Sequence, residues 1–113
     1  MPSVSVIIST YNNPEALELI INRLEESVTL PDQIIVADDG STSNTSELIK
    51  ELSEPARTPI IHCWHEDMGF RKNRILNISL ARVSSDYVVF LDGDCIPHKD
   101  FVKDHLNSLT ANQ

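Results

Sequence analysis

Four short segments of the chain are almost continuously apolar and rich in valine and isoleucine. They cover residues 4–8, 33–37, 59–64 and 87–91. Runs of this length and composition are typical of strands that are buried on both faces of a parallel sheet. The pattern therefore predicts four buried strands.

Apolar residues at helical spacing follow each of these segments. The first helix is predicted from one apolar face, formed by Ala16, Leu17, Ile20, Ile21 and Leu24. A second is predicted around residues 48–52, and we expect Asn44 and Glu47 to form a capping box at its start. The third and fourth helices are expected over residues 70–82 and 98–109.

Strands and helices thus alternate along the whole chain, which favours a parallel sheet with right-handed crossovers. At 113 residues the chain is long enough for one core. We expect an α/β fold in which an open, mainly parallel four-stranded sheet is flanked by helices, as one domain over residues 1–113. The strand at 87–91 is expected to lie beside the first strand.

Composition and charge narrow the possible ligands. Apolar residues make up 41% and charged residues 23%, as in ordinary globular domains. The net charge of -8 argues against nucleic acid as a partner. It also repels a bare phosphate, so a phosphate ligand would need a metal ion or local arginine and lysine to offset the charge.

Cysteine usage and hydropathy indicate the cellular compartment. Cys63 and Cys95 are the two cysteines, which is too few for a disulfide framework and suits reduced thiols in a cytosolic protein. The first residues lack the pattern of a signal peptide, and the run at 88–91 is far too short to cross a bilayer. We expect a cytoplasmic protein without a transmembrane segment, and peripheral attachment to a membrane stays open.

Polar side chains follow every predicted strand, in the segments 9–13, 38–41, 65–67 and 92–94. The carboxyl ends of parallel strands share one edge, and open α/β sheets bind ligands there. We therefore expect a carboxylate-rich site at this edge. Asp38 fits a structural turn before Gly40 as well as it fits a ligand contact.

Asp92 and Asp94 flank Gly93 directly after an apolar strand. Two carboxylates so placed repel each other unless a cation or hydrogen bonds lie between them. A hard divalent ion with oxygen ligands, shared with a diphosphate, removes that repulsion. We therefore expect Mg²⁺ or Mn²⁺ at this pair.

With only three glycines the chain has no glycine-rich loop to hold phosphate groups. Binding of phosphate would then depend on the metal and on cations at the start of the third helix. The candidates are Arg71, Lys72 and Arg74, and each of them fits a solvated helix surface equally well.

Three stretches in this order, residues 4–12, 35–42 and 89–94, resemble the two nucleotide loops and the Asp-x-Asp strand of the family 2 glycosyltransferases. The resemblance covers nearly the whole chain. It implies a Rossmann-like GT-A half-domain of an inverting glycosyltransferase in polysaccharide biosynthesis. The donor would be a nucleotide-diphosphate sugar, with UDP-sugar favoured, and the acceptor a saccharide or a lipid-linked saccharide.

The resemblance also implies a role for each matching residue. Tyr11 would stack on the base, Asp39 would accept a hydrogen bond from it, and Asp94 would coordinate the metal together with Asp92. The family's Arg-Asn pair in the third helix is Leu76-Asn77 here, so the cation must come from elsewhere in that segment. The residues expected to contact the nucleotide are Ser9, Tyr11, Asp39, Arg71, Lys72 and Asp92.

Members of the family continue past the Asp-x-Asp strand into a region that holds the acceptor and the general base. The resemblance therefore implies that the catalytic base lies outside these 113 residues and that they bind donor without transferring it. We also expect exposed apolar surface and self-association.

Three alternatives stay open at this point. The first is a non-catalytic module that binds a nucleotide diphosphate. The second is a phosphatase of the haloacid dehalogenase type, with Asp92 as nucleophile. The third is a sugar nucleotidyltransferase, although its Gly-rich, Arg-bearing first loop has no match in residues 9–13.

Overall fold

A computed structural model describes residues 3–27, 29–67, 69, 72–93, 97 and 101–104. Its centre is a four-stranded sheet with the order β3-β2-β1-β4. The strands are β1 (Val4–Thr10), β2 (Gln33–Asp38), β3 (Ile60–Trp64) and β4 (Tyr87–Leu91). Every pairing is parallel, and β4 lies beside β1, so the predicted fold class and strand adjacency are confirmed.

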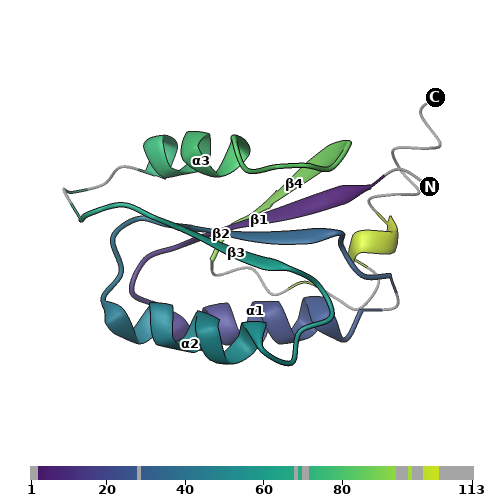
Figure 1. Ribbon diagram of the computed structural model, residues 1–113, viewed down its shortest axis with the longest axis horizontal. Helices are drawn as coiled ribbons and strands as arrows, with labels where there is room; N and C mark the ends of the chain where they lie inside the picture. The colour runs from purple at the N-terminus through teal and green to yellow at the C-terminus, as the bar shows by residue number, and fades with distance from the viewer. Residues whose placement is uncertain are drawn as a thin grey trace.

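Helices cover both faces of the sheet. The helices are α1 (Pro14–Glu25), α2 (Ser43–Ser53) and α3 (Lys72–Leu80). Figure 1 shows α1 and α2 side by side on one face and α3 on the other. Residues 101–104 are also helical, and the rest of the predicted fourth helix lies outside the described residues.

The start of α1 agrees with the sequence pattern, whereas the start of α2 does not. Asn13 caps α1 by accepting a hydrogen bond from the backbone N of Ala16. α2 begins at Ser43 after the N-cap residue Thr42, so the capping box predicted at Asn44 and Glu47 is wrong. The position of Thr42 is instead set by a tertiary contact, because its backbone N donates to Oδ1 of Asn12.

The core has two parts, one on each face of the sheet. Side chains from alternate positions of β1 and β2 pack on α1 and α2, while Ile7, Ile35 and Ala37 pack toward Ile75 of α3. Both central strands are almost fully buried. Since side chains alternate along a strand, the successive residues Asp38 and Asp39 point to opposite faces.

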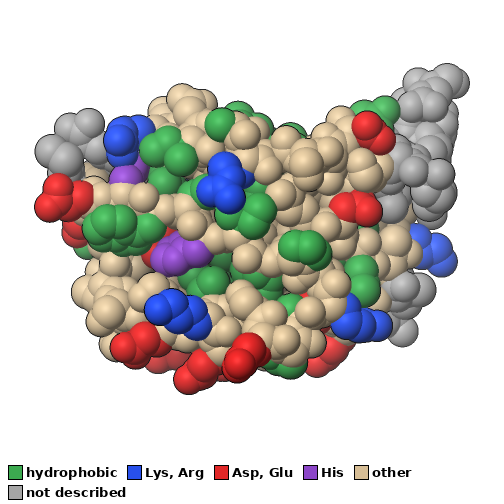
Figure 2. Space-filling model, viewed as in Figure 1, with side chains coloured by type: hydrophobic (Ala, Val, Ile, Leu, Met, Phe, Trp, Pro, Cys, Tyr) green, Lys and Arg blue, Asp and Glu red, His purple; other side chains and the backbone are tan. Residues whose placement is uncertain are grey.

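The surface is rich in acidic side chains, as the net charge of -8 predicts (Figure 2). Figure 2 shows acidic side chains gathered over α1 and α2, while lysine and arginine are scattered singly over the same view. Cys63 is a buried free thiol, and Cys95 lies outside the described residues. No helix in the described part of the chain is both long and apolar enough to cross a membrane.

Candidate functional site

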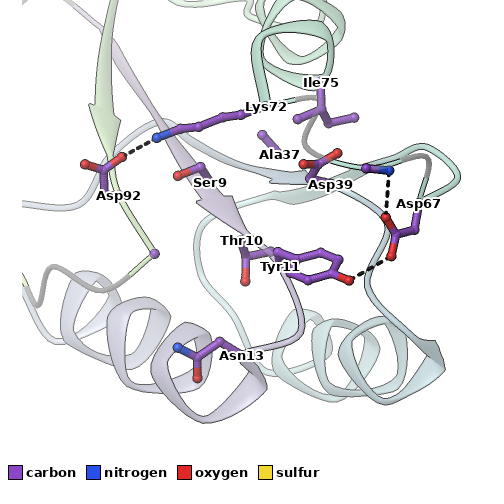
Figure 3. A pocket seen from close by; sticks show the side chains of 12 residues that line it. Ser9, Thr10, Tyr11, Asn13, Ala37, Asp39, Asp67, Lys72, Ile75 and Asp92 are labelled. Carbon is purple, nitrogen blue, oxygen red and sulfur yellow. Dashed lines mark hydrogen bonds and ion pairs between the residues drawn. The ribbon is translucent and has the colours of Figure 1, made fainter.

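A cleft of about 640 Å³ opens at the carboxyl edge of the sheet. The ends of β1, β2 and β4 meet there with the β3–α3 loop and the first turn of α3 (Figure 3). Among the residues predicted to bind nucleotide or metal, those lining the cleft are Ser9, Tyr11, Asp39, Lys72 and Asp92. Arg71 and Asp94 lie outside the described residues.

Tyr11 forms one wall of the cleft. Its ring is half exposed, and its hydroxyl donates to Oδ2 of Asp67 at 2.7 Å (Figure 3). This hydrogen bond, followed by the negative charge of Asp67, raises the pKa of the Tyr11 phenol above its usual value. The ring for which the family resemblance implies base stacking is thus held by a hydrogen bond from the β3–α3 loop.

Asp67 belongs to one of the polar segments expected at this edge of the sheet. It follows β3, which lies at the edge of the sheet far from β4. The β3–α3 loop nevertheless brings Asp67 to the lining of the cleft, where its Oδ1 also accepts from the backbone N of Gly69. The turn of this loop, and not the position of the strand, decides where the carboxylate lies.

Lys72 and Asp92 pair across the opposite side of the cleft. Nζ of Lys72 lies 2.8 Å from Oδ1 of Asp92, and both side chains are well exposed. The hydrogen bond from Lys72, and then its positive charge, lower the pKa of Asp92, with a smaller contribution from a hydrogen bond with Ser9. A cation on the first turn of α3 therefore reaches the end of β4, and of the two predicted cations in the described ranges, Lys72 and Arg74, it is Lys72 that pairs with Asp92.

Two glycines stand where backbone segments meet at this edge. A Cβ atom at Gly93 would overlap the carbonyl oxygen of Ser9. At Gly40, which has a φ of +90°, a Cβ atom would lie 2.5 Å from Cα of Asp67. Glycine is needed at both positions because the close approach leaves no room for a side chain.

Asp38 and Asp39 have different roles. Asp38 is fully buried and accepts from the backbone N of Ser41 at 2.9 Å and from Nε2 of His62 at 2.8 Å. Asp39 lines the cleft on the α3 side of the sheet. The structural interpretation of Asp38 is therefore correct, and Asp39 is the one of the two that lines the cleft.

His65 is a site residue that the sequence analysis missed. It is 6% exposed, and its Nε2 lies 2.5 Å from Oδ1 of Asp39. Its other ring nitrogen, Nδ1, lies 2.6 Å from Nη1 of Arg74 on α3. The histidines have no metal-ligand spacing in the sequence, and the pairing of His65 with Asp39 depends on a strand register that the sequence alone does not give.

Asn12 joins the loops beneath the cleft. Its backbone lies in the left-handed region with a φ of 46°, which asparagine tolerates better than most residues. The backbone N of Asn12 donates to Oγ of Ser41, and Nε1 of Trp64 donates to the carbonyl oxygen of Ser41. The loops after β1 and β2 and the end of β3 are therefore fixed to one another.

Carboxylate oxygens at the cleft suit a hard divalent ion, and Asp92 offers such an oxygen beside the diphosphate position predicted from the sequence. Within the described ranges no group of three or more His, Cys, Asp or Glu side chains converges on a common point. Asp92 therefore fits as one ligand, and its predicted partner Asp94 lies outside those ranges.

The sheet order and the polar cleft at its carboxyl edge are those of α/β domains that bind nucleotides. The profile of Glycosyl transferase family 2 matches residues 5–113, and the chain belongs to this family. This membership decides against the phosphatase and the nucleotidyltransferase. One relative is the chondroitin synthase of Escherichia coli, which is 28% identical over 96% of this chain and 16% of its own length.

Solved structures agree with the family. The mannosyltransferase PcManGT from Pyrobaculum calidifontis, in complex with GDP-Man and Mn²⁺, aligns with a TM-score of 0.82 and 24% identity. That alignment covers 96% of this chain and 32% of the other. Glucosyl-3-phosphoglycerate synthase from Mycobacterium tuberculosis, in complex with Mn²⁺, UDP and phosphoglyceric acid, aligns with a TM-score of 0.74 and 29% identity over 96% and 39% of the two chains.

Proposed function

We propose that residues 1–113 form the donor-binding domain of an inverting glycosyltransferase that uses a UDP-sugar and a divalent metal. The observation that carries this proposal is the arrangement of the cleft. An aromatic ring and a carboxylate, Tyr11 and Asp39, lie at one side, and a carboxylate with a cation, Asp92 and Lys72, lies at the other. Such a cleft has distinct places for a base and for a diphosphate.

The uridine would occupy the side formed by Tyr11 and Asp39. The half-exposed ring of Tyr11 offers a stacking face, and the carboxylate of Asp39 accepts hydrogen bonds. Uracil has a ring N–H that donates to such a carboxylate. Support also comes from the Mycobacterium tuberculosis synthase, a structural relative whose complex contains UDP.

The diphosphate would occupy the side formed by Asp92 and Lys72. Three carboxylates, those of Asp39, Asp67 and Asp92, line the cleft and would repel a bare diphosphate. Mg²⁺ or Mn²⁺ held by Asp92 and Asp94 would neutralise that charge and stabilise the leaving UDP when bound. Lys72, and Arg71 from outside the described ranges, would supply the remaining positive charge.

Transfer requires an acceptor hydroxyl and a base within hydrogen-bond reach of it. We assign the acceptor to the saccharide or lipid-linked saccharide class, and we assign the base to none of the carboxylates of the cleft. In this proposal Asp92 and Asp94 bind the metal, Asp39 binds the uracil ring, and Asp67 accepts a hydrogen bond from Tyr11. Residues 1–113 are therefore expected to bind donor without transferring sugar. The chain spans 16% of the length of the chondroitin synthase that it matches.

Calorimetry with UDP, GDP, CDP and TDP, each with Mn²⁺ and with excess chelator, tests the proposal. We expect UDP to bind most tightly and only with the metal. Glu18→Gln serves as control because it removes one exposed acidic charge from α1 at a residue that does not line the cleft. Equal binding of UDP in chelator would refute the metal role, and equal binding of all four nucleotides would refute the role of Asp39.

A further inference from the structure

Asp39 is the end of a chain of three side chains that leads away from the cleft. Nη1 of Arg74 lies 2.6 Å from Nδ1 of His65, and Nε2 of His65 lies 2.5 Å from Oδ1 of Asp39. His65 is almost completely buried, and the side chain of Asp39 is only 10% exposed. The orientation of the carboxylate in the cleft is therefore fixed from behind by a buried ring.

The chemistry of Arg74 decides which ring nitrogen of His65 carries the proton. A guanidinium group has donors only, so Nδ1 of His65 must be the acceptor in this contact. The ring proton then lies on Nε2, which donates to Oδ1 of Asp39. An imidazolium ring, with a proton on both nitrogens, would direct Nδ1–H at the guanidinium group and lose the contact.

The hydrogen bond from His65 limits which nucleobases can bind to Asp39. With His65 as the donor to Oδ1, the carboxylate presents only acceptor oxygens to a ligand. Uracil and guanine carry a ring N–H on the edge that pairs with other bases, and cytosine and adenine carry a ring acceptor at that place. A site built around a fixed acceptor rejects a ligand that presents another acceptor.

We propose that His65 is a positioning residue which holds Asp39 as an oriented acceptor, and that Arg74 sets the tautomer of His65. Together they make the cleft selective for nucleotides whose base has a ring N–H. The proposal rests on the proposed function, because it requires that Asp39 faces the base. It assigns Arg74 to base selection and not to the diphosphate, for which the sequence also made it a candidate.

Two substitutions of His65 separate its two hydrogen bonds. Gln at position 65 places an amide N–H near the position of Nε2 and keeps the bond to Asp39. Asn places its amide near Nδ1, where its oxygen still accepts from Arg74, and loses the bond to Asp39. Calorimetry with UDP and CDP in the presence of Mn²⁺ gives the ratio of the two affinities for each variant.

We expect His65→Asn to lower the affinity for UDP by roughly ten-fold, the scale of one lost hydrogen bond to a charged group, and to leave CDP nearly unchanged. His65→Gln should keep most of the wild-type ratio. Arg74→Met should lower the ratio through His65. Equal weakening of UDP and CDP by Arg74→Met would assign the guanidinium to the diphosphate and overturn the proposal, as would equal losses in the Asn and Gln variants.

The tautomer is measured without any nucleotide. Long-range nitrogen–proton correlation spectra of the ¹⁵N-histidine protein distinguish a ring protonated at Nε2 from one protonated at Nδ1. We expect Nε2–H for His65 in the wild type and a mixture in Arg74→Met. A proton on Nδ1 in the wild type overturns the proposal, even where the His65 variants fail to fold. If the tautomer is as expected and UDP does not bind, the proposed function fails and the positioning of Asp39 stands.

Discussion

Gly93 lies so close to the carbonyl oxygen of Ser9 that any side chain at position 93 would overlap that oxygen. The atom in the way belongs to the backbone of the neighbouring region of β1, so β1 and β4 would have to separate to accommodate a Cβ. Because Gly93 has no side chain, β1 and β4 can lie close together here, and this close approach sets the width of the cleft beside Asp92.

Gly93→Ala should destabilise the protein by about 1–3 kcal/mol, the usual cost of forcing an extra methyl group into a packed region. It should also weaken binding of UDP, since Ser9 and Asp92 would move apart. Urea denaturation and calorimetry measure the two effects. Asn77→Ala on the exposed face of α3 is the control, and a Gly93 variant with wild-type stability would contradict the steric argument.

Asp38→Ala should reduce stability without changing the affinity for UDP of the folded molecules. Its carboxylate is fully buried, and its loss leaves the backbone N of Ser41 and the ring of His62 without their acceptor. Leaving a buried donor unpaired costs about 1–3 kcal/mol. Urea denaturation gives the loss of stability, and calorimetry well below the melting temperature gives the affinity. A ten-fold loss of affinity with unchanged stability would place Asp38 in the binding site.

Asp39→Ala should mainly reduce the affinity for UDP, whereas Asp38→Ala should mainly reduce stability. It removes the proposed acceptor for uracil, which corresponds to about 1.5–3 kcal/mol and hence to a loss of roughly ten-fold or more in affinity for UDP. CDP should be affected much less, because it is not expected to use that acceptor. Side-by-side titrations of both nucleotides against wild type and variant provide the measurement, and equal losses would count against base recognition by Asp39.

Asp94→Ala should remove most of the metal-dependent part of UDP affinity, since it takes away one of the two proposed oxygen ligands. The expected signature is a titration with Mn²⁺ that resembles the wild-type titration in excess chelator. Glu18→Gln, which also removes one negative charge, should retain the metal effect. A full metal effect in the Asp94 variant would show that the ion is held elsewhere.

The stabilisation from the Tyr11–Asp67 hydrogen bond should be lost at alkaline pH. The hydrogen bond to Asp67 and the charge of Asp67 raise the pKa of Tyr11 above its usual value of 10.0. The stabilisation from this bond is thus complete below the pKa of an unfolded tyrosine and is lost as the pH rises through the higher pKa of the folded state. Asp67→Asn should lower the Tyr11 pKa toward 10.0.

The ultraviolet absorbance of tyrosinate, followed against pH, gives this pKa. Tyr87 is the second tyrosine of the chain and titrates in the same spectrum, so Tyr11→Phe supplies the background curve. A Tyr11 pKa that is identical in the wild type and in Asp67→Asn would show that the hydroxyl does not contact Asp67 in solution.

The sheet could be predicted from the sequence because its signals are local. Runs such as residues 33–37 are apolar on both faces, and their alternation with helices leaves few topologies. The ligand edge follows from the same argument, because each strand end carries polar residues. The individual residues came from the resemblance to the glycosyltransferase family. Ser9, Tyr11, Asp39, Lys72 and Asp92 line the cleft, and Arg71 and Asp94 lie outside the described residues.

The contacts of His65 and Asp67 could not be predicted, because they depend on register and on loop shape. Asp38 pairs with Trp64 across β2 and β3, and this register places the next residues, Asp39 and His65, side by side. A slip by one residue would turn every side chain of β3 to the other face. The start of α2 was misplaced for a similar reason, because Asn12, from a distant part of the chain, holds Thr42.

The cleft is assembled from positions between residues 9 and 93, which the parallel pairing of β1, β2, β3 and β4 brings together. No unfolded or half-paired chain retains it, so by mass action a bound nucleotide stabilises the entire sheet. Saturation at a hundred times Kd corresponds to about 2.7 kcal/mol of added stability. Thermal melting thus becomes a ranking of ligands that needs no acceptor and no turnover: the nucleotide and metal that raise Tm furthest together are the pair that this edge of the sheet selects.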